Sequence, residues 1–387
     1  MVESLRKVFS GRYTGEPLIV RSPGRINLIG EHTDYNNGFV LPAAIDKAVY
    51  VAIGKNNSEV VRLFASAYND FVETPLSAIV PAAKKTWTNY ILGVVDQFQK
   101  RGYHVRGFDL AITGDVPLGA GLSSSAAVEC AVAFALNEIF DFRLNRLDLV
   151  KLAQKAEHEF AGVMCGIMDQ FASVFGKKDH VIKLDCRSLD FEYVPLKLKG
   201  YKLLLVDSQV KHSLASSAYN KRREECQMSV ELIRKKYPIV LSLRDATPEM
   251  LYECIKPIDD ILFKRASFVV NEIMRVPLAC NDLTENNIQA FGQKMFTTHE
   301  GLSTQYEVSC RELDFLVDRV KVIPSVLGAR MMGGGFGGCT LNIVEESTVD
   351  DLIDFLAQQY YEAFSINLKT YPVNLEEGTG IVGSSLV

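Results

Sequence analysis

Residues 21–42 read Arg21-Ser-Pro-Gly-Arg-Ile-Asn-Leu-Ile-Gly-Glu-His-Thr-Asp-Tyr-Asn-Asn-Gly-Phe-Val-Leu-Pro42. The first half is rich in apolar residues that favour strands, and the pattern breaks at Gly30. Four polar side chains then follow within five residues: Glu31, His32, Asp34 and Tyr35. Burying them without partners would be costly, and carboxylates, imidazole and phenol all bind hydroxyl groups. We therefore expect a pocket for a small polyol, most simply a sugar. The alternative is a polar turn at residues 36–38.

Length and composition bound the class of protein. A chain of 387 residues predicts two domains, and 48% hydrophobic with 23% charged residues is typical of a soluble globular protein. The net charge of −5 opposes general nucleic-acid binding. We expect no signal peptide and no membrane span, because the longest nearly apolar helix candidate, residues 126–136, is too short to cross a bilayer.

The cysteines and histidines carry no ligand pattern. None of the eight cysteines has Cys-x-x-Cys spacing, and the six histidines are scattered along the chain. Such usage predicts free thiols in a reducing compartment rather than a disulfide framework or a zinc site. We therefore expect a cytoplasmic protein.

A second motif spans residues 115–127, where a strand is expected to lead through a glycine-rich turn into a buried helix. Gly119 and Gly121 allow a ligand to approach the backbone, and a helix N-terminus offers unpaired N–H groups to phosphate. The following serines, residues 123–125, add hydroxyl groups, one of which could bind Mg²⁺. The motif is not a Walker A loop. The alternative is a core helix capped by a serine.

Two acids lie in apolar surroundings further along. Glu157 falls on the apolar face of a helix expected from residue 144 to about residue 161. An acid at such a place is either a metal ligand or a hydrogen-bonded structural acid. Asp169 lies between Met168 and Phe171. Beside a sugar hydroxyl it could accept a proton, and the alternative is an acid at a helix N-terminus.

The third motif, residues 331–340, contains five glycines between strands expected at residues 325–332 and 339–344. Such a loop lets a phosphate or another backbone approach closely. A plain hairpin is the alternative, although it needs fewer glycines.

Residues 23–35 resemble the signature of galactokinases, which belong to the GHMP kinase superfamily together with homoserine and mevalonate kinases. The second and third motifs match that family in the same order, so the resemblance covers essentially the whole chain. It implies an α+β fold of two domains. Residues 1–195 would form a ribosomal-protein S5-like domain that binds sugar and ATP. Residues 196–387 would form a ferredoxin-like domain with the glycine-rich third motif, and the active site would lie in the cleft between them.

The resemblance also implies an activity: transfer of the γ-phosphoryl group of ATP, with Mg²⁺, to O1 of α-D-galactose, the first committed step of galactose catabolism. We expect a monomer with no nucleic-acid or membrane partner. The rivals are a kinase for another sugar, such as N-acetylgalactosamine or arabinose, and a non-catalytic galactose sensor. Intact small residues at 125–127 favour an enzyme over a sensor.

The resemblance assigns roles residue by residue. Asp169 would accept or orient the O1 proton, and Arg25 would stabilise the developing charge. The implied sugar-binding residues are Glu31, His32, Thr33, Asp34, Gly166 and Tyr219. The implied nucleotide-binding residues are Ser66, Trp87, Gly119, Ala120, Gly121, Leu122, Ser123, Ser124 and Ser125. Ser125 and Glu157 would bind the metal. For Trp87, a place in the core is an open alternative.

Overall fold

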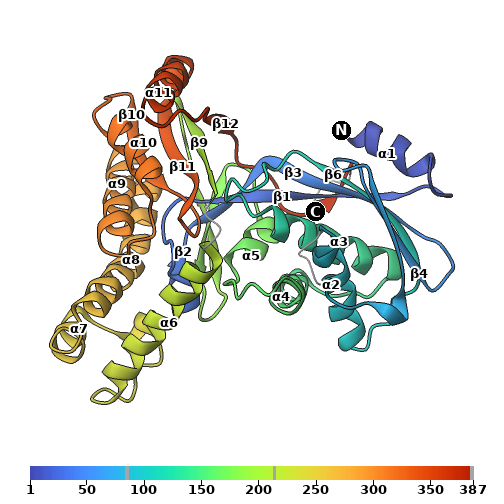
Figure 1. Ribbon diagram of the computed structural model, residues 1–387, viewed down its shortest axis with the longest axis horizontal. Coiled ribbons are helices and arrows are strands. Elements are labelled where there is room, and N and C mark those ends of the chain that lie inside the picture. Colours follow the sequence, from blue (N-terminus) through green and yellow to red (C-terminus); the bar gives the residue numbers. More distant parts are fainter. Residues whose placement is uncertain (83–86, 212–214, 384–387) are drawn as a thin grey trace.

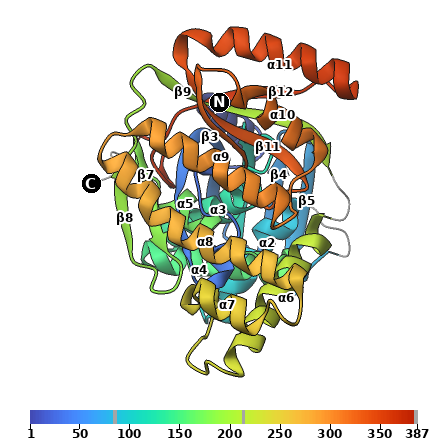
Figure 2. The ribbon, with the colours of Figure 1, turned by 90° about the vertical axis from the view of Figure 1, so that its left-hand side faces the viewer.

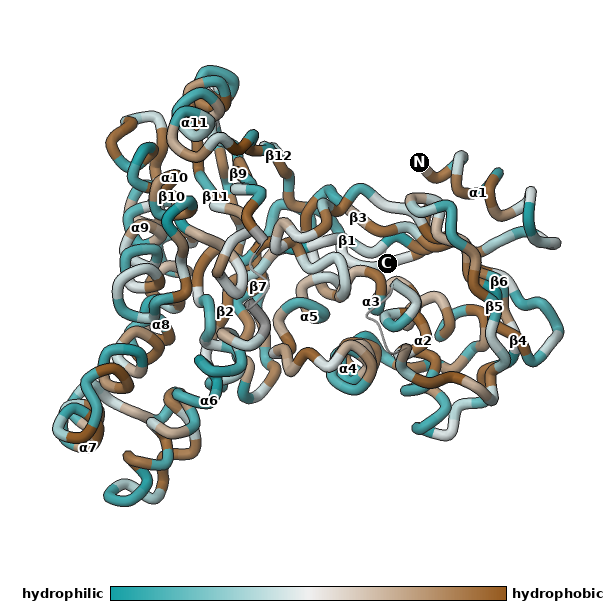
Figure 3. Tube along the Cα trace, in the orientation of Figure 1, coloured by the Kyte–Doolittle hydropathy of each residue, from teal (hydrophilic) through white to brown (hydrophobic). Residues whose placement is uncertain are grey.

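The computed structural model describes residues 1–82, 87–211 and 215–383. The chain forms two lobes that lie side by side, one built by the N-terminal half and one mainly by the C-terminal half (Figure 1). Hydrophobic segments gather in the strands and in the helices that pack against them (Figure 3). None of the described helices is long and apolar enough to cross a membrane.

The N-terminal lobe is a six-stranded sheet in the order β13-β1-β3-β6-β4-β5, antiparallel except for the pair β4 and β6. Helices α2 to α5 lie together on one face, while α1 packs against β3 and β6 (Figure 1). The strands are β1 (Leu18–Asn27), β3 (Pro42–Lys55), β4 (Val60–Ala65), β5 (Asp70–Pro75), β6 (Phe108–Gly114) and β13 (Gly380–Ile381). The helices are α1 (Val2–Ser10), α2 (Trp87–Lys100), α3 (Ser124–Phe140), α4 (Arg146–Ala156) and α5 (Met168–Phe175).

The C-terminal lobe has a four-stranded sheet in the order β10-β11-β9-β12. Figure 2 shows α8 and α9 lying side by side, and α9 packs against β10 of this sheet. The strands are β9 (Tyr201–Lys211), β10 (Val326–Met331), β11 (Gly337–Glu345) and β12 (Lys369–Val373). The helices are α6 (Ala215–Arg234), α7 (Pro248–Cys254), α8 (Asp260–Thr284), α9 (Ile288–Thr304), α10 (Arg311–Lys321) and α11 (Val349–Phe364).

A third, small sheet joins the first motif to residues 180–195. Its strands are β2 (Phe39–Val40), β7 (His180–Asp185) and β8 (Phe191–Pro195), in that order. Short 3-10 turns lie at Asp34–Asn36, Leu76–Ala78, Leu243–Asp245 and Glu346–Thr348.

The motif helices and strands form where the pattern predicts them, with one difference. Helix α3 is buried along most of its length because its residues are small or apolar on nearly every side. Strands β10 and β11 confirm the two strands predicted around the third motif. The helix predicted to about residue 161 instead ends at Ala156, and residues 157–161 form a π-helical turn. Such turns occur frequently at functional sites, and this one carries Glu157.

The division predicted at residues 195 and 196 falls between β8 and β9 and stays a prediction. Residues near 375–381 nevertheless return to the N-terminal sheet. Ile381 and Gly380 pair with Val20 and Arg21 of β1, and Leu375 bridges to Ile45. The end of the described chain is therefore part of the N-terminal lobe.

Candidate active site

A cavity of about 200 Å³ lies where the lobes meet, and residues of the first and third motifs line it. A pocket of this size suits a ligand smaller than a drug molecule. Its lining includes Arg25, Glu31, His32, Asp34, Glu157, Cys165, Gly166, Asp169, Tyr219, Gly333 and Gly334. A larger cavity of about 760 Å³, beside the residues that return to β1, contains none of the predicted site residues.

Arg25 and Asp169 meet at this cavity as a two-pronged ion pair. The Arg25 Nε donates to Asp169 Oδ1 and its second terminal nitrogen to Oδ2, both at 2.8 Å. Burial alone would lower the pKa of Arg25, but the Asp169 carboxylate outweighs it and raises that pKa. Such bidentate pairs fix geometry as well as charge. The predicted convergence of residues 25 and 169 is therefore present in the fold.

The glycine-rich turn of the second motif is attached to the same pair. The Arg25 guanidinium donates to the Gly121 carbonyl at 2.5 Å, and its backbone N–H donates to the Leu122 carbonyl at 3.1 Å. Gly119 and Gly121 both have positive φ, 78° and 77°. Ala120 and Leu122 are buried, so neither side chain is available to a ligand.

Ser123 does not cap helix α3, which corrects the alternative of a serine cap. It occupies the N-cap position with φ 56° but makes no side-chain cap bond. Its hydroxyl instead donates to Asp169 Oδ2. A left-handed, non-glycine residue at such a place is typical of functional sites, where surrounding contacts maintain the strain.

The loop of the first motif presents Glu31 and His32 to the cavity. Glu31 accepts bonds from the Asn27 side chain and the Gly333 amide at 2.8 and 2.7 Å. The Nδ1 of His32 lies 2.8 Å from the Tyr35 hydroxyl, and its buried Nε2 has no partner among the described residues. Burial lowers the pKa of His32 to about 4, so the ring is neutral at pH 7. A neutral imidazole nitrogen facing the cavity can exchange a hydrogen bond with a hydroxyl group.

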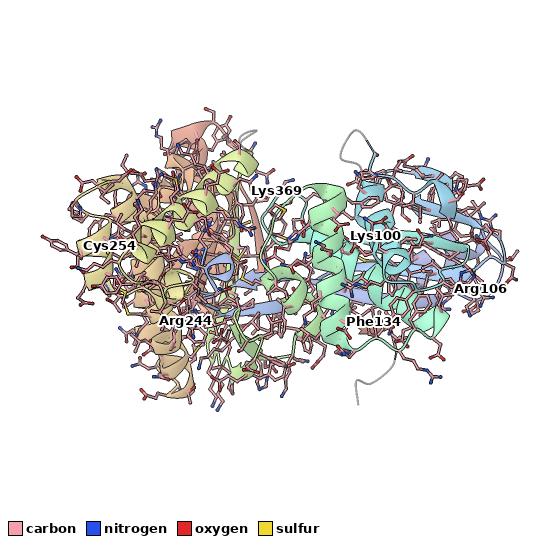
Figure 4. The ribbon with its side chains drawn as sticks, turned by 90° about the horizontal axis from the view of Figure 1, so that it is seen from below. Lys100, Arg106, Phe134, Arg244, Cys254 and Lys369 are labelled. Atoms are coloured by element: carbon pink, nitrogen blue, oxygen red, sulfur yellow. The ribbon has the colours of Figure 1, made fainter. Side chains whose placement is uncertain are left out.

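Thr33 lies behind this loop rather than in the cavity lining. Its hydroxyl is within hydrogen-bond distance of the Gly30 and Phe39 carbonyls, at 2.9 and 2.5 Å. The side chain therefore holds the turn closed, which differs from the predicted sugar contact. Arg244, labelled in Figure 4, supports the turn from the C-terminal lobe by lying 3.7 Å over the Phe39 ring.

Asp34, Gly166 and Tyr219 also line the cavity. Burial, and then the charge of Asp169, raises the pKa of Asp34 to about 6. A Cβ atom on Gly166 would lie 1.7 Å from the Asp34 carboxylate, so only glycine leaves room for that acid. The ring of Tyr219 lies 5.5 Å from the His32 ring and contacts Gly334 of the third motif.

Ser125 and Glu157 form the candidate metal site. The Ser125 hydroxyl donates to Glu157 Oε1 at 3.0 Å, and the Gln170 amide donates to Glu157 Oε2 at 2.6 Å. The same amide reaches Glu129 at 3.3 Å, whose other oxygen is buried without a partner among the described residues. Burial, and then the charge of Asp169, raises the pKa of Glu157. A cation would relieve this concentration of acids.

This donor set fits Mg²⁺. The ion prefers hard oxygen ligands and commonly takes one or two carboxylates together with water and substrate phosphates. The described residues contain no cluster of three or more carboxylate, histidine or cysteine ligands. Ser125 and Glu157 supply hard oxygen donors of the kind that this ion prefers.

A second cavity of about 250 Å³ borders the start of α3. It is lined by Ser124 and Ser125 at one end and by Trp87, Tyr90 and other largely apolar residues. The indole N–H of Trp87 donates to Asp70 at 2.8 Å. Ser66 is outside the lining, although Ala65 and Ala67 on either side contribute to it. The hydrogen bond from Ser125 to Glu157 therefore joins this largely apolar cavity to the polar one.

Comparison with known proteins agrees with this geometry. Residues 7–55 match the galactokinase galactose-binding signature, and residues 89–177 and 281–362 match the N- and C-terminal domains of GHMP kinases. The galactokinase of Thermotoga maritima is 45% identical over 93% of this chain and 98% of its own length. The chain belongs to the galactokinase family.

Other galactokinases give the same result. That of Clostridium acetobutylicum is 38% identical over 97% of each chain. The crystal structure of Lactococcus lactis galactokinase complexed with galactose superposes with a TM-score of 0.94 at 33% identity, over 98% of this chain and 100% of the other. A mevalonate kinase with TM-score 0.63 and 19% identity shares the fold. The predictions of the family, of the two-domain GHMP kinase fold and of an ATP-dependent sugar kinase are confirmed.

Four residues at this galactokinase site were not predicted from the sequence. Glu129 and Gln170 lie behind Glu157, while Asn27 and Arg330 lie behind Glu31. The sequence does contain a signal for Glu129, because it is the one acid within the apolar run of residues 126–136. Arg330 carries none, since one arginine in a strand gives no indication of its partner.

Proposed function

We propose that the chain transfers the γ-phosphoryl group of ATP to O1 of α-D-galactose, with Asp169 and Arg25 at the reacting oxygen. One observation carries this proposal: the bidentate pair of these residues lines a cavity together with residues of the galactose-binding signature, and the pair is hydrogen-bonded to Gly121 and Ser123 of the second motif. Neither rival, a kinase for another sugar or a non-catalytic sensor, gains support from the relatives, which are named galactokinases.

Phosphoryl transfer asks the protein mainly for positioning and charge stabilisation. Asp169 accepts one bond on Oδ1, from Arg25, and two on Oδ2, from Arg25 and Ser123. A carboxylate oxygen accepts about two hydrogen bonds, so Oδ1 keeps a position for the O1 hydroxyl of the sugar. Asp169 orients that hydroxyl and accepts its proton, while the Arg25 cation offsets negative charge on the attacking oxygen.

The other polar groups of the cavity would bind the remaining hydroxyls. Glu31, Asp34 and His32 offer acceptors or a neutral imidazole, and Tyr219 closes the pocket beside Gly334. A site built from such groups rejects an epimer strongly, because a misplaced hydroxyl leaves a buried polar group unpaired.

The nucleotide would lie along the glycine-rich turn of the second motif. Its base would occupy the apolar cavity beside Trp87, and its phosphates would lie at the N-terminus of α3. Ser125 and Glu157 would hold Mg²⁺. When bound, the ion neutralises phosphate charge. We also propose that the protein is a cytoplasmic monomer: one chain supplies both cavities, and all eight cysteines are free thiols.

A panel of sugars tests the proposal. We would measure ADP release with ATP and Mg²⁺ for galactose, glucose, N-acetylgalactosamine and arabinose, with Asp169→Asn as the inactive control. Galactose should give the highest kcat/KM. A higher value for another sugar would reassign the substrate, and galactose binding without ADP release would indicate a sensor.

A further inference from the structure

Arg330 is a fully buried cation at the junction of the lobes, on β10, and it is not part of the cavity lining. Its Nε donates to the Leu28 carbonyl and one terminal nitrogen to the Met331 carbonyl, both at 2.8 Å. The other terminal nitrogen donates to the Asn27 carbonyl and, at 2.8 Å, to Glu31 Oε1. One side chain of the C-terminal lobe thus holds both the backbone and the carboxylate of the first motif.

Glu31 uses three of its acceptor positions within the protein. Oε1 accepts from Arg330 and from the Gly333 amide, and Oε2 accepts from the Asn27 side chain. A carboxylate offers about four such positions. Because Glu31 lines the cavity, the remaining position on Oε2 is the one available to a ligand hydroxyl. The direction of that position is set by the three bonds already made.

We propose that Arg330 is a positioning residue: it fixes the Glu31 carboxylate and so determines which hydroxyl of the sugar the cavity selects. The inference rests on the proposed function, since it concerns the sugar site of that reaction. Arg330 does not touch the sugar and acts through Glu31. Gly333 belongs to the glycine loop of the third motif, so the same carboxylate also joins that loop to the first motif.

The contact requires arginine rather than a positive charge alone. The four bonds of Arg330 leave in different directions from one planar group. A lysine ammonium is a point charge with three donors and cannot reproduce this fork. Arg330→Lys therefore keeps the buried charge balance with Glu31 while loosening the carboxylate.

The test separates positioning from a merely structural role. We would measure kcat and KM for galactose, for ATP and for the monodeoxygalactoses, in the parent enzyme, Arg330→Lys and Glu31→Gln. A reacting geometry displaced by about 1 Å costs about 10²-fold in rate. We expect Arg330→Lys to lower kcat/KM for galactose by about 10²-fold, with the KM for ATP within about twofold. For one deoxygalactose, the sugar that lacks the Glu31-bound hydroxyl, kcat/KM in both variants should be close to its value in the parent enzyme. An equal fall in kcat/KM for galactose and for every monodeoxygalactose would overturn the proposal.

A double-mutant cycle gives a second readout. If Arg330 acts through Glu31, Arg330→Lys should cost far less in the Glu31→Gln background than in the parent, whereas additive losses would overturn the proposal. Arg265→Lys is the matched control, because Arg265 pairs with Glu225 and Glu307 away from the cavity, and its kcat/KM should match the parent.

A variant that does not fold and a parent enzyme that is inactive on galactose can be told apart. If Arg330→Lys does not fold, Arg330→Gln combined with Glu31→Gln removes both buried charges, and it should show the same deoxygalactose pattern as Glu31→Gln alone. A different pattern would overturn the proposal. A parent enzyme that fails to phosphorylate galactose overturns the proposed function itself, before any variant is compared.

Discussion

Replacing Gly166 by alanine would displace the Asp34 carboxylate from the sugar cavity. The added Cβ would lie 1.7 Å from Asp34 Oδ2 and 2.3 Å from its Cγ. Carbon atoms in ordinary contact are about 3.5 Å or more from their neighbours, so the carboxylate must move by about 2 Å. A hydrogen bond to a charged group contributes about 1.5–3 kcal/mol, which corresponds to roughly 10- to 150-fold in affinity. We therefore expect kcat/KM for galactose to fall about 10²-fold in Gly166→Ala.

The assay for this variant is ADP release over a matrix of galactose and ATP concentrations. The KM for ATP should stay within about twofold of the parent value, because the apolar cavity does not include Gly166. Gly162→Ala is the control: this glycine also lines the sugar cavity, and its Cβ would meet nothing within 4 Å, so the substitution adds only the backbone strain of its φ of 67°. Retention of kcat/KM within about threefold in Gly166→Ala would refute the reasoning, as would equal losses in both variants.

Four further outcomes are expected. Asp169→Asn should lower kcat by roughly 10²-fold or more while ATP still binds, and near-normal turnover would remove its role at the reacting oxygen. Arg25→Lys should lose much of the activity in the same steady-state assay, since one ammonium cannot replace the two-pronged contact; full activity would contradict this. Ser125→Ala should raise the Mg²⁺ concentration needed for half-maximal rate, and an unchanged metal titration would exclude Ser125 as a ligand. Because the pKa of Asp34 is raised to about 6, this acid gains a proton as the pH falls through 6; kcat/KM for galactose measured from pH 5 to 8 should fall below that value, and Asp34→Asn should remove that limb.

The residue pattern alone predicted a polar motif suited to a sugar. The family resemblance was needed to predict which distant residues meet that motif. Residues 25 and 169 are 144 positions apart, and neither composition nor periodicity relates them. Only the resemblance predicted that they meet. The same holds for Ser125 and Glu157, whose spacing along the chain gives no sign of a shared ligand.

Other features depend on tertiary contacts that no local pattern encodes. The π-helical turn at residues 157–161 ends a helix whose apolar period continues through it. Thr33 lies among cavity residues in sequence, yet its hydroxyl faces two backbone carbonyls. Arg330 reaches Glu31 across 299 positions, so its role became visible only with the lobes in place.

The return of residues 380 and 381 to β1 has a consequence for synthesis of the chain. Until they leave the ribosome, β1 has a neighbour on one side only, and its outer edge keeps unpaired N–H and C=O groups. Pairing across some 360 positions is slow to form, since the intervening segment must be closed into a loop first. The nascent N-terminal lobe therefore spends most of translation with one sheet border open. During that interval, the open border offers backbone groups with which another strand can pair.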